Sequence, residues 1–415
     1  MQRYGLIGEK LGHSYSKKIH EQLCTYTYDL IPLSQEEFPK FMALKSFTAL
    51  NVTIPYKEKV IPYCDWIDKK ARSIGAVNTL VHKDGKLYGY NTDYDGFLYL
   101  LKKNHIHLKN KKILILGTGG TSKTVAACAR DLGAGTILFV SRRKKDNVIT
   151  YQECSAHPDT EIIINTTPCG MYPNTGKCLL PLDLFPKCTD IVDVIYNPLK
   201  TELLLQGEKR GIHAVNGLEM LVAQAKFAAE YFIGLPIENS QIHKIRQKLL
   251  RELTNIVLIG MPGCGKTSIG KKIAKQLQKT FIDTDAFIVK KTGMPISQIF
   301  EQYGESYFRQ LEAEVVSEVS KNTGQVIATG GGVIKREENI YHLKQNGLIF
   351  FINRDVKLLQ AGKGRPLSSD KAAIWQLFKE RYPLYKKYAD IRINNNNFTT
   401  TIRKVMNKYD EYFSH

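Results

Sequence analysis

The chain is 415 residues long, which is too long for one ordinary domain and predicts two or three. Hydrophobic residues make up 43% of it, enough for packed cores, yet no stretch approaches the roughly 18 consecutive apolar residues that a membrane helix requires. The net charge of +19 raises the possibility of a nucleic-acid partner, but the lysines are interleaved with glutamates and form no arginine-rich stripe. We therefore expect a solvated, lysine-rich surface, with neither a membrane nor a nucleic-acid partner.

The N-terminus and the cysteines indicate the compartment. The segment from Met1 to Ser14 enters an apolar run at once, without the core and cleavage site of a secretory signal. The eight cysteines are scattered, with no Cys-x-x-Cys pair and no Cys/His spacing typical of a metal site. We expect them to be reduced thiols in folded cores, and the protein to be cytoplasmic.

Residues 1–100 alternate short apolar runs, which we expect to be strands, with helix-like segments. Four polar stretches interrupt the apolar runs: GHSYSKKIH, NVTIPYKEKV, GAVNTL and GYNTDYDGF. They contribute hydroxyls, an amide and a lysine–aspartate pair, namely Ser14, Ser16, Thr53, Lys57, Asn78 and Asp93. Such groups suit a small polyhydroxylated ligand, with the lysine and the aspartate available for proton transfer beside a hydride donor. Any one of these residues, taken alone, is more often a helix cap or a turn residue than a ligand.

The next segment has the pattern of a doubly wound domain. We expect its parallel strands at 113–116, 137–140, 162–165 and 191–194. After the first strand, Gly117-Thr118-Gly119 opens a helix, as in dinucleotide folds, where glycines let the backbone approach a pyrophosphate at the helix N-terminus. The third small position holds Ser122 instead of glycine. The pattern predicts a Rossmann-type lobe over residues 101–215.

The end of the second of these strands indicates the cofactor. An NAD site usually carries an acidic residue there for the ribose, whereas this chain reads Ser141-Arg142-Arg143. An arginine at this point suits a 2′-phosphate, so the sequence favours NADPH. The alternative is that both arginines are ordinary surface residues of a loop.

Residues 1–235 resemble the shikimate dehydrogenase family nearly motif for motif, including INTTPCGMYP, DVIYNPLKT and NGLEMLVAQA. The resemblance implies that Ser14 and Ser16 hold the substrate carboxylate. It implies that Lys57, paired with Asp93, moves a proton while hydride passes between NADPH and the substrate carbonyl. The residues expected at the ring hydroxyls, with a tyrosine nearby, are Thr53, Asn78, Asp93, Gln224 and Tyr196.

The same resemblance implies the residues that contact NADP. They belong to the glycine loop, the arginine loop and two later turns: Gly117, Thr118, Gly119, Gly120, Thr121, Ser122, Ser141, Arg142, Arg143, Thr166 and Gly217. Thr118, Thr121 and Ser141 depart from the commonest versions of these loops, which leaves the cofactor affinity open but not the cofactor class.

A phosphate loop opens the last part of the chain, after a helix-like stretch (LEMLVAQAKFAAEYFIG) and a polar connector that can be partly helical. An apolar strand ending at Ile259 leads into Gly260-x4-Gly265-Lys266-Thr267. Backbone N–H groups of such a loop wrap a β-phosphate, the lysine reaches the β and γ oxygens, and the threonine ligates Mg²⁺. The pattern predicts ATP and Mg²⁺ but does not name the phosphate acceptor.

Residues 253–395 resemble the shikimate kinase family through FIDTDAFI, GESYFRQLE, ATGGGVI, GRPL and ERYPLYKKYAD. The resemblance implies that Asp283 holds the metal through water and that Asp285 binds and orients the substrate hydroxyls. Arg309 and Arg381 are expected to grip the carboxylate, because a guanidinium fits a carboxylate with two hydrogen bonds. Backbone amides of three glycines would approach the substrate: Gly330, Gly331 and Gly332.

The resemblance also places ATP on the phosphate loop and a mobile lid, with these contacts: Gly263, Cys264, Gly265, Lys266, Thr267, Ser268, Lys363 and Arg365. Arg365 is expected to come down on the transferring phosphate. The lid sequence LLQAGKGRPLSSD is short and lacks the additional arginine that many relatives carry before RPL, and Lys363 is the candidate replacement.

The expected fold is therefore α/β: a substrate lobe and a Rossmann NADP-binding lobe, followed by a P-loop kinase domain with a parallel sheet and flanking helices. The expected domains are 1–238 (substrate lobe 1–100 and 216–238, NADP lobe 101–215), a connector at 239–252, and 253–415.

The expected function is a bifunctional enzyme that reduces 3-dehydroshikimate with NADPH and then phosphorylates shikimate with ATP. The catalytic residues would be Lys57, Asp93, Lys266, Asp285 and Arg365. One alternative is a quinate/shikimate dehydrogenase that uses NAD, against which Arg142 and both serines argue. The others are a nucleic-acid-binding protein and a regulatory pseudoenzyme built on these folds. The sequence does not indicate an oligomeric state.

Overall fold

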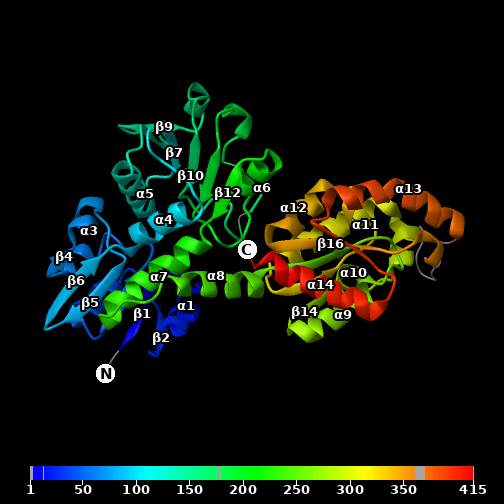
Figure 1. Cartoon of the computed structure of the whole chain (residues 1–415), viewed down its shortest axis with the longest axis horizontal. Coiled ribbons are helices and arrows are strands. Elements are labelled where there is room, and N and C mark those ends of the chain that lie inside the picture. Colours follow the sequence, from blue (N-terminus) through cyan, green and yellow to red (C-terminus); the bar gives the residue numbers. More distant parts are fainter. Residues whose placement is uncertain (1–2, 13, 174, 177–178, 360–369, 415) are drawn as a thin grey trace. The chain divides into compact units, whose positions relative to one another are not determined.

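The computed structural model describes residues 3–12, 14–173, 175–176, 179–359 and 370–414 (Figure 1). The chain divides into two compact units. Residues 1–197 and 201–246 form the first unit, and residues 198–200 and 247–415 form the second.

The first unit begins with a six-stranded sheet in the order β2-β1-β3-β5-β6-β4. Its strands are β1 (Tyr4–Gly8), β2 (Tyr28–Pro32), β3 (Ala49–Val52), β4 (Trp66–Ile67), β5 (Thr79–Lys83) and β6 (Lys86–Tyr90). Its helices are α1 (Ser16–Leu23), α2 (Glu37–Leu44), α3 (Lys69–Ile74), α4 (Thr92–Lys103) and the returning α7 (Leu218–Ile233). β1 pairs in parallel with β2 and β3, so the segments that follow β1 and β3 leave the sheet at the same edge. That edge carries the polar stretches seen in the sequence.

The second sheet of this unit is fully parallel, in the order β12-β11-β10-β7-β8-β9. The strands are β7 (Lys112–Leu116), β8 (Thr136–Ser141), β9 (Val148–Thr150), β10 (Ile162–Asn165), β11 (Asp190–Asp193) and β12 (His213–Asn216), with helices α5 (Gly120–Asp131) and α6 (Glu202–Lys209). The order of strands reverses at β7, which lies between β8 and β10. In such sheets ligands bind beyond the carboxyl ends of the strands at this reversal. The Rossmann-type lobe expected from the sequence is thus confirmed.

The segment expected as a polar connector contains one continuous helix, α8 (Ser240–Leu253). Besides its charged residues, this helix has an apolar face, formed by buried side chains at helical spacing: Ile242, Ile245, Leu249 and Leu253. The last turn is capped by Lys279, whose ammonium donates to the carbonyls of Arg251 and Glu252 at 2.9 Å each. Residues 240–246 of the helix cluster with the first unit and residues 247–253 with the second.

The second unit is built on a five-stranded parallel sheet in the order β14-β15-β13-β16-β17. The strands are β13 (Asn255–Ile259), β14 (Thr280–Asp283), β15 (Gln325–Ala328), β16 (Gly347–Asn353) and β17 (Ile391–Asn394). The helices are α9 (Lys266–Leu277), α10 (Thr284–Thr292), α11 (Ile296–Ser320), α12 (Glu337–Asn346), α13 (Lys371–Tyr388) and α14 (Phe398–Tyr412). β13 is central and fully buried, and the phosphate loop leaves its carboxyl end. This arrangement confirms the expected P-loop fold.

The expectations about membrane helices and cysteines can be compared with the described residues. In that part of the chain, no helix combines the length and the apolar character needed to cross a membrane. The cysteines there are free thiols, some buried and some half-buried: Cys24, Cys64, Cys128, Cys154, Cys169, Cys188 and Cys264.

Candidate active sites

The first unit holds a close ion pair between two predicted catalytic residues. The ammonium nitrogen of Lys57 lies 2.6 Å from Oδ2 of Asp93, and the two side chains are 16% and 10% exposed. Lys57 stands on the segment that follows β3, and its carbonyl accepts from the N–H of Val77 at 2.8 Å. Asp93 occupies the first turn of α4. The pair is therefore fixed by two elements and still reachable by a small molecule.

An amide network lies next to this pair. Oδ1 of Asn78 accepts from the N–H of Thr92 at 2.7 Å, and Nδ2 of Asn78 donates to Oε1 of Gln224 at 3.5 Å. The hydroxyl of Thr79 also donates to Oδ1 of Asn78, at 3.0 Å. Gln224 comes from α7, 146 residues further along the chain. The structure thus brings together Lys57, Asn78, Asp93 and Gln224, as their shared assignment to one site requires.

The other predicted polar residues of the first hundred lie along the edge where β1 and β3 end. The N–H of Thr53 donates to the carbonyl of Ile7 at 2.9 Å, and Oγ of Ser14 accepts from the N–H of Ser16 at 3.2 Å. Ser16 is buried at the start of α1. Tyr196 packs against Tyr15, with ring centroids 5.7 Å apart, and burial raises the pKa of Tyr196 to about 12. Tyr196 is therefore a neutral phenol at physiological pH.

The glycine loop after β7 is braced by hydroxyl groups. Gly117 has a φ of +112°, and a Cβ on it would lie 2.9 Å from Oγ1 of Thr166. The hydroxyls of Ser122 and Thr166 are 2.7 Å apart, and Thr166 donates to the carbonyl of Leu116 at 2.6 Å. Ser122, at the third small position of the motif, therefore ties the loop after β7 to the loop after β10. The sequence offered no signal for this bond.

The N-terminus of α5 begins at a backbone position that other protein atoms leave open. Gly119 precedes the helix, and a Cβ there would meet no protein atom within 4 Å. Gly120 and Thr121 form the first turn, whose N–H groups have no partner inside the helix. Gly217 directly follows β12, the strand at one end of the sheet. It approaches the carbonyl of Val194 so closely that any side chain would overlap it.

The arginine loop lies at the end of β8. The Ser141 hydroxyl accepts from the N–H of Arg143 at 3.2 Å and donates to its carbonyl at 3.1 Å. This turn holds Arg142 and Arg143 exposed to solvent. The positive charge that a 2′-phosphate requires is thus present beyond the strand next to the glycine loop.

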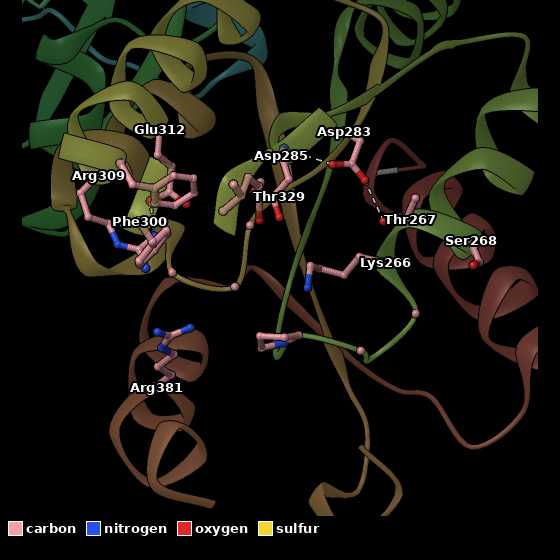
Figure 2. A pocket seen from close by; sticks show the side chains of 18 of the residues that line it. Lys266, Thr267, Ser268, Asp283, Asp285, Phe300, Arg309, Glu312, Thr329 and Arg381 are labelled. Carbon is pink, nitrogen blue, oxygen red and sulfur yellow. Dashed lines mark hydrogen bonds and ion pairs between the residues drawn. The ribbon is translucent and has the colours of Figure 1, made fainter. Parts of the chain in front are cut away.

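The second unit contains a cavity of about 400 Å³ around the phosphate loop (Figure 2). The predicted residues that line it are Gly263, Gly265, Lys266, Thr267, Ser268, Asp283, Asp285, Arg309, Gly330, Gly331, Gly332 and Arg381. The ammonium of Lys266 donates to the carbonyls of Gly260 and Met261 at 2.8 and 3.0 Å. Cys264 is not among the residues that line the cavity, and its side chain is fully buried. Lys363 and Arg365 lie outside the described residues.

A hydroxyl and a carboxylate meet at the edge of this cavity. Thr267 donates to Oδ2 of Asp283 at 2.7 Å. The other carboxylate oxygen of Asp283 caps α10, where it accepts from the N–H groups of Asp285 and Ala286 at 3.1 and 3.2 Å. Oxygen ligands of this kind suit Mg²⁺, which usually takes one or two protein ligands and completes its shell with water and phosphates. Among the described residues, no cluster of three or more His, Cys, Asp or Glu side chains forms a metal cage.

Asp285 is the perturbed acid of the cavity. Burial, with the negative charges of Asp283 and Glu312 nearby, raises its pKa to about 6. Its Oδ1 atom is buried without a hydrogen-bond partner. A Cβ on Gly330 would lie 2.7 Å from that oxygen, so glycine leaves room beside it. A raised carboxyl pKa and a free acceptor are both properties of a general base.

The two arginines expected at a carboxylate line the same side of the cavity, as Figure 2 shows. Arg309 is held by carboxylates, since Nη1 lies 2.7 Å from Glu312 and Nη2 lies 3.1 Å from Glu305. Arg381 is buried, and its Nε and Nη2 atoms have no hydrogen-bond partner.

Neither glutamate was among the site residues predicted from the sequence. Glu312, three residues after Arg309 in the stretch GESYFRQLE, was detectable from its helical spacing.

Comparison with known proteins identifies both units. Residues 6–80 match the shikimate dehydrogenase substrate binding domain, and residues 262–411 match shikimate kinase. The shikimate dehydrogenase (NADP(+)) of Clostridium perfringens is 38% identical over 270 residues, which cover 60% of this chain and 98% of that protein.

Solved structures agree. Shikimate dehydrogenase 1 from Peptoclostridium difficile is 37% identical with a TM-score of 0.57, over 60% of this chain and 98% of that one. A chorismate mutase/shikimate 5-dehydrogenase fusion protein from Clostridium acetobutylicum is 38% identical with a TM-score of 0.57, over 60% and 97%. The chain therefore belongs to the shikimate dehydrogenase family and carries a shikimate kinase domain after it, as a bifunctional enzyme of the shikimate pathway.

Proposed function

We propose that the first unit reduces 3-dehydroshikimate to shikimate with NADPH, and that the second unit phosphorylates the 3-hydroxyl of shikimate with ATP and Mg²⁺. The hydroxyl made in the first step is the nucleophile of the second. The observation that carries the proposal is the presence in one chain of the Lys57–Asp93 pair beside an amide cluster and of a phosphate-loop cavity with two arginines.

In the first unit, Lys57 is proposed as the proton donor to the substrate carbonyl oxygen. The carboxylate of Asp93, 2.6 Å away, orients the ammonium group. Thr53, Asn78 and Gln224 would bind the ring hydroxyls with Asp93, and Ser14 and Ser16 would hold the substrate carboxylate, with Tyr196 nearby. NADPH, when bound, supplies the hydride.

The cofactor would lie on the glycine loop. Gly117 to Ser122 would surround the pyrophosphate at the N-terminus of α5, and Arg142 and Arg143 would bind the 2′-phosphate with Ser141. Thr166 and Gly217 would border the same crevice. The Ser122–Thr166 bond ties this loop to the loop after β10.

In the second unit, Asp285 is proposed to orient the substrate hydroxyl and to accept its proton at the unpartnered Oδ1 atom. Arg309 and Arg381 would bind the substrate carboxylate, beside the backbone of Gly330, Gly331 and Gly332. Lys266 would contact the β and γ phosphates. Mg²⁺ would bind Thr267 directly and Asp283 through water, and ATP, when bound, supplies the phosphoryl group. Arg365 and Lys363 are proposed as lid contacts from the sequence alone.

A coupled assay on the purified chain tests both halves. With 3-dehydroshikimate, NADPH and Mg·ATP together, we expect NADPH oxidation, ADP release and shikimate 3-phosphate by mass spectrometry. Without NADPH, ADP release should stop, whereas added shikimate should restore it. ADP release from 3-dehydroshikimate in the absence of NADPH would contradict the proposed order. Faster oxidation of quinate with NAD⁺ than of shikimate with NADP⁺ would contradict the assigned dehydrogenase.

A further inference from the structure

The cavity of the second unit contains a cation to which the proposed function gives no role. Arg354 lines the cavity together with the phosphate loop. It directly follows β16, which pairs with β13 so that Ile259 lies opposite Phe351. The two strands remain adjacent beyond this point, because a Cβ on Gly260 would lie 2.5 Å from the carbonyl oxygen of Ile352. Arg354 therefore leaves the sheet beside the first residues of the phosphate loop.

The guanidinium of Arg354 is incompletely satisfied. Its Nε–H is buried and has no hydrogen-bond partner. Arg309 differs, because its Nε and both terminal nitrogens donate to Glu305 and Glu312. A buried charged donor without an acceptor is unfavourable, so a bound anion is the natural partner of Arg354.

The cavity separates two kinds of anion site. Arg381 lies within electrostatic reach of Glu312, which binds Arg309, so these two arginines belong to the substrate side. Lys266 and Thr267 lie on the other side, at the phosphate loop (Figure 2). Arg354 follows the strand next to that loop. Its position therefore favours a phosphate over the substrate carboxylate.

We propose that Arg354 binds the phosphates of the nucleotide and stabilises the phosphoryl group during its transfer. The inference rests on the proposed kinase function and adds a residue to it. A guanidinium suits this task because its planar fork offers several donors to phosphate oxygens, and because it stays charged when partly buried. Lys266 also donates to two carbonyls of its own loop. Arg354 is therefore the second cation that neutralises the negative charge of the nucleotide.

The test compares Arg354→Met, Arg354→Lys and the control Arg392→Met in the full chain. Arg392 is an exposed arginine of β17 that stacks on Tyr382 and does not line the cavity. For Arg354→Met we expect kcat/KM for ATP to fall roughly 10- to 100-fold, the worth of a hydrogen bond to a charged group. Calorimetric titration should show weaker ADP binding and unchanged adenosine binding. Arg354→Lys should lie between the wild type and Arg354→Met, and Arg392→Met should match the wild type.

Several outcomes would overturn the inference. Wild-type ADP affinity in Arg354→Met would remove Arg354 from the phosphates, and a rise in KM for shikimate alone would move it to the carboxylate. Equal losses of ADP and adenosine binding would indicate a structural role. If Arg354→Met fails to fold, the ADP and adenosine titrations of Arg354→Lys decide the same question. A wild-type chain that binds ADP but does not phosphorylate shikimate would refute the kinase proposal and leave the Arg354 titration valid.

Discussion

The two candidate sites differ in whether their buried charged and polar groups have partners. At the proposed substrate site of the first unit the lysine and the aspartate are paired and the amide of Asn78 is satisfied, since Lys57 meets Asp93 at 2.6 Å and Asn78 uses both ends of its amide. In the second unit Asp285, Arg354 and Arg381 keep buried polar atoms without partners. In the first unit the proposed substrate site is separate from the NADPH loop and can have its polar groups paired in advance, whereas the cavity of the second unit must bind nucleotide phosphates, a metal and a carboxylate together and leaves donors and acceptors open. Open charged groups reduce the stability of the protein without ligand.

Removal of the ion pair in the first unit should have the largest effect. Lys57→Ala should lower the dehydrogenase rate roughly 10²- to 10⁴-fold, the usual worth of a positioned acid or base. Phosphorylation of added shikimate should remain at the wild-type rate, because Lys57 belongs to the other unit. Lys59→Ala, two residues away and exposed, is the matched control. Near wild-type reduction of 3-dehydroshikimate by Lys57→Ala would show that the role is misassigned.

Asp285→Asn should separate activity from stability in the second unit. The kinase rate should fall roughly 10²- to 10⁴-fold through loss of the base, while the folded unit becomes more stable at neutral pH. The folded pKa of about 6 lies above the ordinary aspartate value of 3.8, so ionisation of Asp285 opposes folding as pH rises between these values. The gain in unfolding free energy should be at most about 3 kcal/mol above pH 7 and vanish below about pH 4.

Urea unfolding in a Trp66→Phe background measures this gain, because the fluorescence then comes from Trp375 in the second unit alone. The wild-type kinase rate should also rise with pH through about 6, as Asp285 loses its proton. A gain in stability that is the same at pH 4 and pH 8 would argue against the buried charge as its cause.

Arg142→Ala tests the cofactor assignment. We expect KM for NADPH to rise roughly 10- to 100-fold, because a charge-assisted bond to the 2′-phosphate is lost. KM values for 3-dehydroshikimate and for NADH should change little, since neither ligand carries that phosphate. Arg130→Ala, at an exposed position of α5, is the control. Equal use of NADH and NADPH by the unmodified chain would exclude this role.

The hydroxyl brace should have a smaller effect. Ser122→Ala should cost about 0.5–1.5 kcal/mol of unfolding free energy, the net worth of one hydrogen bond. NADPH binding should weaken only a few-fold, because the backbone of the loop remains. Thr166→Val and the double variant complete a thermodynamic cycle, and purely additive effects would show that the 2.7 Å contact is not an energetic bond.

The smallest effect should follow from separating the units, if each keeps all of α8. Each half of this helix buries apolar residues, so we propose fragments 1–253 and 240–415, which both contain it. Both fragments should be folded, one with dehydrogenase and one with kinase activity, within about twofold of the full chain, since each is of ordinary domain size. A kinase fragment that is active only after addition of the first would refute the proposed boundary.

The motifs of this chain were readable because each encodes a local backbone shape. The phosphate loop, the Gly117 turn and the strands around them follow from glycine positions and apolar runs a few residues long. The same locality explains why the connector was described from the sequence as polar. Its many charged residues dominate the composition, although α8 also has an apolar face. An explicit search at helical spacing reveals that face, and it also reveals the Arg309–Glu312 pair.

Contacts between distant segments were not readable in this way. The bond from Asn78 to Gln224 spans 146 residues, and the Ser122–Thr166 brace spans 44. The family resemblance implied shared sites for these residues, but no local pattern states which hydroxyl meets which.

Local sequence therefore specified the two nucleotide loops, the succession of strands and helices along the chain, and the residue types of both sites. Packing decided which of those residues are buried, paired or left open. The raised pKa of Asp285 and the unpartnered Nε of Arg354 are products of burial, which depends on every element that surrounds the cavity. Desolvation and long-range electrostatics act through space, and a linear sequence carries no direct record of which atoms become neighbours.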